Sequence, residues 1–207
     1  MLYEITDEEG IVHSYKLRTP PKPIIRKRGF RKGDKAPEFA VNSADIVWTD
    51  KPVSTGRLIH TRQLITRSLV IAFYCEAWGA YGSEVIQQLR ALHHKTTLAG
   101  ANFLVLTQTK PHEIPAMADR LDLDFNMGYD KNNRIARHFG VYDPRYPVWD
   151  RIAGINEDVF SPGLFVIGSD GKFISAQVDR DFELHWDDSL LNEGLASPYE
   201  ERSLKFA

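Results

Sequence analysis

The stretch Leu69-Val-Ile-Ala-Phe-Tyr-Cys75 is the longest uninterrupted apolar run in the 207-residue chain. Its continuous apolar character and its β-branched and aromatic side chains are typical of a strand that is covered on both faces. We therefore expect residues 69–74 to form a central parallel strand. The run is also far shorter than the roughly 18 residues that a membrane-spanning helix needs, so no such helix is expected.

Helices and strands alternate along the chain after this run. Apolar residues at helical spacing predict an amphipathic helix over residues 83–94, and residues 103–106 repeat the buried-strand pattern. The same alternation continues with a helix that begins near Pro111, a strand over residues 125–129, a helix around residues 135–139 that Gly140 ends, and strands over residues 164–167 and 172–178. The last two strands flank a Gly-Ser-Asp-Gly turn and predict a hairpin whose second strand lies at the sheet edge. The predicted fold class is α/β, with a central mixed sheet flanked by helices.

The chain outside this domain divides into short segments. Residues 1–18 hold two β-rich runs around an acidic turn, and we predict that they form an N-terminal hairpin extension. Residues 19–33 contain three prolines, which oppose both helix and central strand, so they are interpreted as a linker rich in Pro, Arg and Lys. The main domain then covers residues 34–186, and residues 187–207 form a C-terminal tail.

Charge is unevenly distributed along the sequence. The formal charge is −2, from 26 basic and 28 acidic residues, which is not the positive excess of a general nucleic-acid binder. Residues 16–35 nevertheless hold nine basic residues against one acid. This segment either meets an acidic partner or RNA, or it is a solvated arm folded against its own acidic body. We favour the arm, because charge blocks of this length occur without a ligand.

Residue types also bear on location and cofactors. The N-terminus carries acidic residues where a signal peptide needs lysine or arginine, so a cytoplasmic location is expected. Cys75 is the single cysteine, which excludes an internal disulfide. The seven histidines fall into no metal-ligand spacing, and no glycine pattern of a nucleotide site occurs. Neither a metal nor a cofactor is expected.

Several motifs together carry a family resemblance. They are Gly33-Asp-Lys-Ala-Pro-Glu-Phe39, Trp78-Gly-Ala-Tyr-Gly82, Ile135-Ala-Arg-His-Phe-Gly140, Ser161-Pro-Gly-Leu-Phe-Val-Ile-Gly-Ser-Asp-Gly-Lys172 and Val178-Asp-Arg-Asp-Phe182. In order and spacing they resemble the peroxiredoxin-like branch of the thioredoxin superfamily, which comprises alkyl hydroperoxide reductase, thiol-specific antioxidant and redoxin proteins. The resemblance covers roughly residues 33–185. It implies a thioredoxin-like fold, antioxidant thiol oxidoreductase chemistry and frequent homodimers.

The candidate active site departs from what the resemblance implies. The family carries a reactive cysteine at the start of the helix after the first central strand, where amide protons and the helix dipole stabilise a thiolate. The pattern Trp-Cys-x-x-Cys places Gly79 and Gly82 at its two cysteines. The pattern Pro-x-x-x-Thr-x-x-Cys places Cys75 at its proline and Gly82 at its cysteine. Both alignments lose the thiol, and the family's late arginine corresponds to His185.

Other residues of this degenerate site keep two interpretations each. Pro162 matches a proline that the thioredoxin fold holds in the cis form, so a cis peptide bond is expected there, whether or not chemistry occurs beside it. Trp78 and Tyr81 either line a pocket mouth or pack at the helix start. The glycines at the helix start expose amide groups that suit a small anion, although water or a neighbouring loop would also satisfy them.

Two functions from different classes remain open. The first is a non-catalytic binding or interaction module, with a small anion or a peptide at the vestigial site. A homodimer is a further expectation, from aromatic residues outside the clearest core patterns: Tyr142, Tyr146, Trp149 and Trp186. The second is a thiol peroxidase that uses Cys75. We expect Cys75 not to be peroxidatic, because burial and the adjacent Glu76 both raise the pKa of a thiol.

Overall fold

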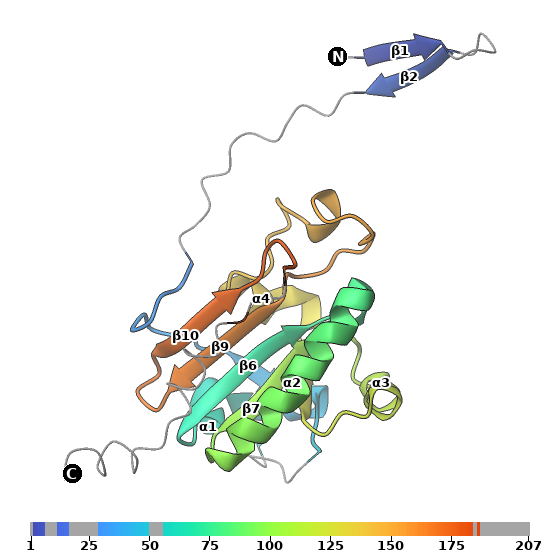
Figure 1. The fold of residues 1–207 in the computed structure, drawn as a ribbon. Coiled ribbons are helices and arrows are strands. Elements are labelled where there is room, and N and C mark those ends of the chain that lie inside the picture. Colours follow the sequence, from blue (N-terminus) through green and yellow to red (C-terminus); the bar gives the residue numbers. More distant parts are fainter. Residues whose placement is uncertain (1, 7–11, 17–28, 50–55, 184–185, 187–207) are drawn as a thin grey trace, which may run out of the picture.

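The structure is a computed structural model that describes residues 2–6, 12–16, 29–49, 56–183 and 186. Within these residues the main sheet has six strands in the order β10-β9-β6-β7-β8-β4 (Figure 1). Strand β6 (Ser68–Tyr74) lies between β7 (Asn102–Thr107) and β9 (Gly163–Gly168), and every residue of β6 is buried. The central strand that the apolar run predicts is therefore confirmed.

The pairing of the strands makes the sheet mixed. Strands β6, β7 and β8 (Asn126–Tyr129) are parallel, and β9 runs antiparallel to β6. Strand β10 (Phe173–Val178) pairs with β9 as the predicted hairpin and lies at the edge of the sheet. Gly171 supplies a φ of 75° in the turn between them, a value that glycine adopts without steric cost. The α/β fold class with a mixed sheet is confirmed.

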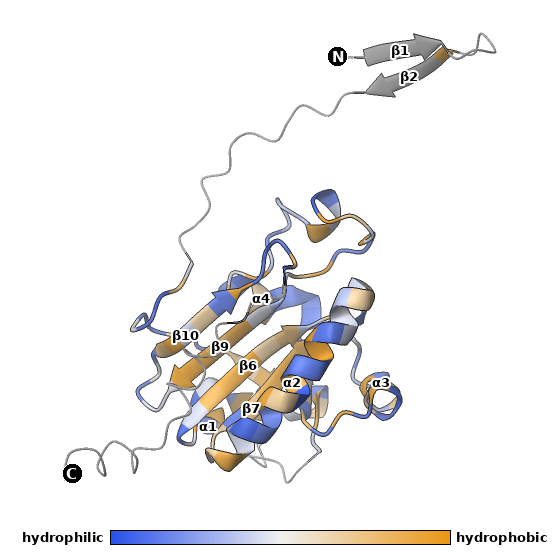
Figure 2. Cartoon of the chain, in the orientation of Figure 1, coloured by the Kyte–Doolittle hydropathy of each residue, from blue (hydrophilic) through white to orange (hydrophobic). Residues whose placement is uncertain are grey.

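Helices lie on both faces of the sheet. In Figure 1, α2 (Ala80–Leu98) crosses one face over β6 and β7, and α4 (Arg134–His138) lies behind the sheet. Helix α3 (Ile114–Leu121) follows β7. Figure 2 shows that the inner strands are hydrophobic, whereas α2 mixes hydrophobic and hydrophilic residues, as expected for a helix with one buried face. Helix α2 extends further at both ends than the predicted 83–94.

Neighbouring residues of β6 point to opposite faces, as the pleat requires. Phe73 packs against Phe139 and Phe165, with ring centroids 5.6 Å and 5.9 Å away, on the face that α4 covers. Tyr74 instead packs edge-on against Trp78, 5.7 Å away, near the start of α2. The last two residues of β6 therefore connect its carboxyl end to both layers of the core.

Several short elements are not predicted by the sequence. Strands β3 (Ala40–Asn42) and β5 (Leu58–His60) form a separate antiparallel pair, followed by α1 (Thr61–Leu64). Strand β4 (Ile46–Val47) adds to β8. The 3₁₀ turns are η1 (Ser43–Asp45), η2 (Glu76–Trp78), η3 (Lys131–Asn133) and η4 (Val148–Asp150). Elements of two to four residues show little periodicity, and of this length only β8 is predicted.

The N-terminal hairpin is confirmed in its strands. Strands β1 (Leu2–Thr6) and β2 (Val12–Lys16) pair antiparallel, whereas the predicted turn lies outside the described residues. Most of the predicted linker and the tail over residues 187–207 also lie outside them. The end of the linker contacts the domain, because Gly33 N donates to Phe173 O at 2.8 Å and the Phe30 ring lies 4.8 Å from the Phe173 ring.

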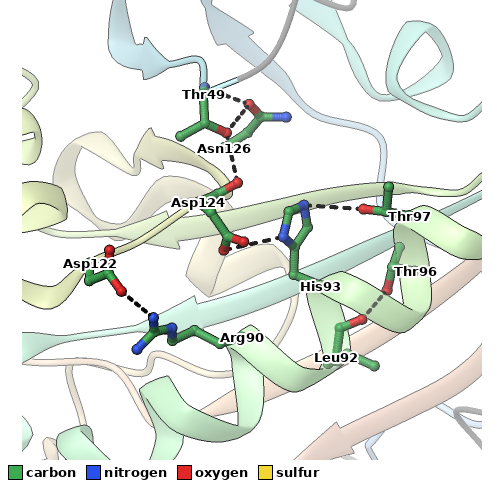
Figure 3. Close-up of polar contacts among 9 residues, drawn as sticks. All are labelled: Thr49, Arg90, Leu92, His93, Thr96, Thr97, Asp122, Asp124 and Asn126. Atoms are coloured by element: carbon green, nitrogen blue, oxygen red, sulfur yellow. Dashed lines mark hydrogen bonds and ion pairs between the residues drawn. The ribbon is translucent and has the colours of Figure 1, made fainter.

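A group of polar contacts holds the loop before β8 against α2 (Figure 3). His93 Nδ1 lies 3.3 Å from Asp124 Oδ1, and its Nε2 lies 3.3 Å from Thr97 Oγ1. Thr49 Oγ1 donates to Asp124 O at 3.0 Å from the other side. The His93 ring also packs on Phe103, so this histidine has a structural role.

Candidate functional site at the carboxyl end of strand β6

The candidate site begins where β6 ends. Cys75 follows Tyr74 directly, η2 comes next, and Gly79 joins η2 to α2. Gly79 adopts φ 61° and ψ −130°, a combination that L-residues with a side chain rarely reach. This backbone conformation would strain a residue with a side chain, which explains why glycine occupies position 79, where the family resemblance places a cysteine.

Cys75 is buried and its thiol is protonated at neutral pH. Its exposed fraction is 7%. Burial raises the pKa of the thiol to about 12, and the carboxylates of Glu157 and Glu76 raise it further, against the lowering effect of a hydrogen bond from the Ala77 backbone. A protonated thiol is a poor nucleophile. The predicted burial and raised pKa of Cys75 are confirmed.

Gly82 lies in the first turn of α2 and is closely packed. A Cβ at this position would lie 3.3 Å from the Cys75 carbonyl oxygen, 3.5 Å from Trp78 Cβ and 3.7 Å from Tyr74 Cε2. The φ of Gly82 is not positive, so space rather than backbone conformation limits a side chain here. The position is thus enclosed by the end of β6 and by the side chain of Trp78.

An aromatic cluster covers the start of α2. It consists of Trp78, Tyr81, Phe160 and Phe182. Trp78 is at its centre, with ring centroids 5.7 to 6.0 Å from the other three and all three contacts edge-on. Its exposed fraction is 4%, and its Nε1 donates to Phe160 O at 3.1 Å. Of the two interpretations of Trp78, packing at the helix start is the one the structure supports.

Tyr81 links this cluster to the segment after β10. Its Oη donates a hydrogen bond of 2.6 Å to Asp179 Oδ2. Burial, this hydrogen bond and the charge of Asp179 all raise the pKa of the Tyr81 hydroxyl, so it stays protonated as a donor. The sequence motif 178–182 carries Asp179 and Phe182, but their contacts with α2 could not be predicted from it.

A cleft of about 730 Å³ opens at the carboxyl ends of β6 and β7, and Cys75 lines one side of it. Its acidic lining residues are Glu76, Glu113, Glu157 and Asp158. Arg120 is the arginine of the lining and forms an ion pair with Glu76. The acidic excess of this neighbouring cleft disfavours a bound anion, and the anion expected at Gly79 and Gly82 stays a prediction.

The prediction of a cis bond before Pro162 is wrong, because the described residues contain no cis peptide bond. Two backbone hydrogen bonds flank this trans bond at the start of β9. Ser161 N donates to Val141 O at 2.8 Å, and Asp179 N donates to Pro162 O at 3.0 Å. Trans is the preferred state of an X–Pro bond unless its surroundings favour cis. The match of Pro162 to a motif position does not show which residues surround the bond.

Other predicted site residues and ligands have different outcomes. His185 lies outside the described residues. Tyr142, one of the aromatic residues taken to lie outside the core, is buried, whereas Trp149 is exposed. Across the part of the chain that the structure describes, no group of three His, Cys, Asp or Glu residues could hold a metal ion. No described helix has the length and apolar character to cross a membrane.

Solved structures share this fold. A peroxidoxin BcpB from Mycobacterium tuberculosis is 17% identical, with a TM-score of 0.56 over 80% of this chain and 94% of that one. A reduced 2-Cys peroxiredoxin from Plasmodium vivax is 15% identical, with a TM-score of 0.60 over 84% of both chains. AhpC from Enterococcus faecalis is 14% identical, with a TM-score of 0.60 over 86% of this chain and 96% of that one. The chain therefore has the thioredoxin-like fold of peroxiredoxins.

The family follows from a sequence comparison. The model of the AhpC/TSA family matches residues 32–175, which is more than half of the chain. The chain belongs to the AhpC/TSA family. No curated protein matches it.

Proposed function

We propose that this AhpC/TSA-family protein does not reduce peroxides and uses the redoxin scaffold as a binding or interaction module. The observation that carries the proposal is the state of its one thiol. Cys75 is buried, and burial raises its pKa to about 12. The thiolate is the species that attacks a peroxide, and at neutral pH such a group is almost entirely protonated.

The start of α2 supports the same proposal. Gly79 and Gly82 stand where the family resemblance places motif cysteines, and glycine offers no nucleophile. Gly82 is enclosed by Trp78 and Tyr74, so the position is filled by packing rather than open to a peroxide. A scaffold of this kind retains the core of a redoxin, because the core depends on apolar strands and not on thiols.

The alternative is a thiol-dependent peroxidase that uses Cys75. The observation in its favour is that Cys75 lines the acidic cleft at the carboxyl ends of β6 and β7. In open α/β sheets, this edge is where ligands bind.

A peroxide assay separates the two functions. Hydrogen peroxide consumption is measured with dithiothreitol as reductant, for the full chain and for Cys75→Ser, beside an active 2-Cys peroxiredoxin as the positive control. We expect both forms of this protein to match the rate of dithiothreitol and peroxide alone. Rapid consumption by the unmodified chain that Cys75→Ser abolishes would establish the peroxidase instead.

The partners within this proposal are a second copy of the chain and a small anion or peptide at the start of α2. Trp149 supports the first, because an exposed tryptophan favours an interface. Light scattering that gives 23.6 kDa at high micromolar concentration contradicts the homodimer. Titration with sulfate that leaves the amide chemical shifts of residues 79–82 unchanged contradicts the anion.

A further inference from the structure

A small groove lies between the β3–β5 pair and α4. Its volume is about 290 Å³, and it is lined by residues 38–40, by His60 and by residues of α4. None of residues 75–82 is among its described lining residues, so the groove is separate from the candidate site described above. Its volume is just below the range of clefts that hold drug-sized molecules, so the groove suits a smaller ligand.

The β3–β5 pair forms one wall of the groove. Ala40 of β3 lies directly opposite His60 of β5 in the register of the pair. Thr61, the next residue, accepts a 2.7 Å hydrogen bond from Phe39 N with its Oγ1, and its own N donates to Phe39 O at 2.9 Å. Thr61 is buried, so these bonds fix the position of His60 relative to β3.

Helix α4 forms the other wall. Arg134 and His138 are four residues apart, so they lie on the same face of the helix, and both line the groove. Arg134 Nη2 donates to Ala40 O at 2.7 Å, and this bond joins α4 to β3. The acceptor is an uncharged carbonyl oxygen, so the bond orients the guanidinium without cancelling its charge. A guanidinium has five N–H donors, and the other donors of Arg134 make no hydrogen bond among the described residues.

The carboxylate in the groove is already paired with cations. Glu38 is the one carboxylate among the described lining residues. Lys35 Nζ and Arg62 Nη2 lie 3.4 Å and 3.2 Å from its Oε1. Hydrogen bonds from Lys35 and Arg62, together with their charges, hold the pKa of Glu38 below its ordinary value. Glu38 therefore stays ionised, and two cations share its single negative charge.

Asp130 is a second carboxylate near Arg134, but it is buried outside the lining. It is 1% exposed, and its two oxygens accept hydrogen bonds from Ile135 N at 2.8 Å and Ala136 N at 2.7 Å. Burial raises the pKa of Asp130, and the charge of Arg134 opposes that rise. Even with Asp130 counted, the cations at and beside the groove outnumber the carboxylates. A cleft with an excess of one sign of charge concentrates ligands of the opposite sign.

We infer that this groove binds a single phosphate group, either inorganic phosphate or the phosphate of a small monoester. The planar guanidinium of Arg134 matches the geometry of phosphate oxygens. The imidazoles of His60 and His138 each carry at least one N–H donor, and protonation adds a second donor and a positive charge. The inference does not rest on the anion proposed at the start of α2, because the groove contains neither Gly79 nor Gly82.

An NMR titration of the full chain at constant ionic strength tests the inference with three probes. Inorganic phosphate carries the charged group alone, glycerol phosphate carries it as a monoester, and glycerol carries no charge. We expect at least one phosphate to cause saturable shifts of the amide signals of Ala40, His60 and residues 134–138, and glycerol to cause none. The phosphate that binds more tightly identifies the source. The same spectra follow residues 79–82 separately, so each anion site succeeds or fails on its own.

Variants locate the binding. Arg134→Gln should weaken phosphate binding about tenfold, as expected for hydrogen bonds to a charged group. His138→Gln should weaken it about threefold, as expected for an exposed ionic contact. Arg137→Gln removes a charge from an exposed arginine of the same helix that does not line the groove, and it should bind like the unmodified chain.

The two groove variants also guard against misfolding. His138 is exposed, so its variant decides the matter if Arg134→Gln fails to fold. Shifts that do not saturate, or that chloride reproduces at the same ionic strength, would show an adventitious ion only and overturn the inference. Binding that neither groove variant weakens also overturns it.

Discussion

Tyr81 Oη donates a 2.6 Å hydrogen bond to Asp179 Oδ2, and this bond joins the first turn of α2 to the segment after β10. The Tyr81 ring also lies 4.7 Å from the Phe182 ring, so the bond and the ring contact hold the same two segments together. The aromatic cluster at the start of α2 therefore includes a polar contact between parts of the chain that are far apart in the sequence.

Tyr81→Phe should lower the free energy of unfolding by about 1 to 3 kcal/mol, because it leaves the partly buried Asp179 carboxylate without this donor. Urea denaturation measures the loss. A double-mutant cycle with Asp179→Asn isolates the interaction, since the second substitution should then cost less than it does alone. Additive losses would show that the hydrogen bond contributes nothing to stability.

Alkaline pH should destabilise the protein through Cys75. The folded thiol has a pKa of about 12 against an ordinary value of 9.0, so between these values the unfolded chain loses a proton that the folded chain keeps. Stability is therefore fully present below pH 9 and falls as the pH rises toward 12. Tyr74, whose pKa is also raised to about 12 by burial, adds to the same decline.

Urea denaturation at a series of alkaline pH values tests this dependence. Cys75→Ala removes the titrating thiol, so its stability should decline less steeply above pH 9 than that of the unmodified chain. Tyr74→Phe serves as an independent second comparison. Parallel declines for the unmodified chain and Cys75→Ala would mean that the thiol ionises equally easily in both states.

The two glycines at the start of α2 should respond differently to alanine. Gly79→Ala forces a side chain into φ 61° and ψ −130° and should cost about 1 to 3 kcal/mol. Gly82→Ala places a Cβ 3.3 Å from the Cys75 carbonyl oxygen, but it also gains about 1 kcal/mol of helix propensity. We expect the smaller loss for Gly82→Ala. The opposite order in thermal or urea unfolding would refute the backbone argument.

The sequence predicts the parts of the fold that have long apolar patterns. Residues 69–74, 103–106 and 164–167 lie in one sheet as expected, because a strand buried on both faces must be apolar throughout. The burial of Cys75 also follows from its place at the end of such a strand. In contrast, β4 has two residues and pairs with β8 from a distant part of the chain, so no local sequence pattern predicts it.

Features that depend on tertiary contacts could not be predicted. The bond before Pro162 is trans, and the hydrogen bonds beside it reach Val141 and Asp179, which no motif reveals. Folding also brings Arg137 of α4 and Arg180, which follows β10, to the lining of one cleft, whereas the charge pattern of the sequence pointed to residues 16–35. Local charge counting finds blocks along the chain, but it misses charges that folding brings together.

Introducing a thiol at position 82 should not produce peroxide reduction. In the Cys75→Ser background, Gly82→Cys places its Cβ 3.5 Å from Trp78 Cβ and 3.7 Å from Tyr74 Cε2, inside the packed start of α2. The thiol would gain the helix dipole, which lowers its pKa, but it would also be enclosed by Trp78 and Tyr74, which raises it. Because Trp78 is nearly fully buried, we expect enclosure to dominate.

Two measurements check this expectation. The introduced thiol should react with a soluble disulfide reagent much faster after unfolding in urea than in the folded protein, and hydrogen peroxide consumption should stay at the background rate. Trp78→Ala, added to the same variant, keeps the Cβ beside position 82 but removes the ring that packs on Tyr74, so it should increase the reactivity of the folded thiol by loosening Tyr74. If Gly82→Cys alone consumes peroxide rapidly, the packing of Trp78 and Tyr74 around position 82 does not prevent peroxide chemistry there.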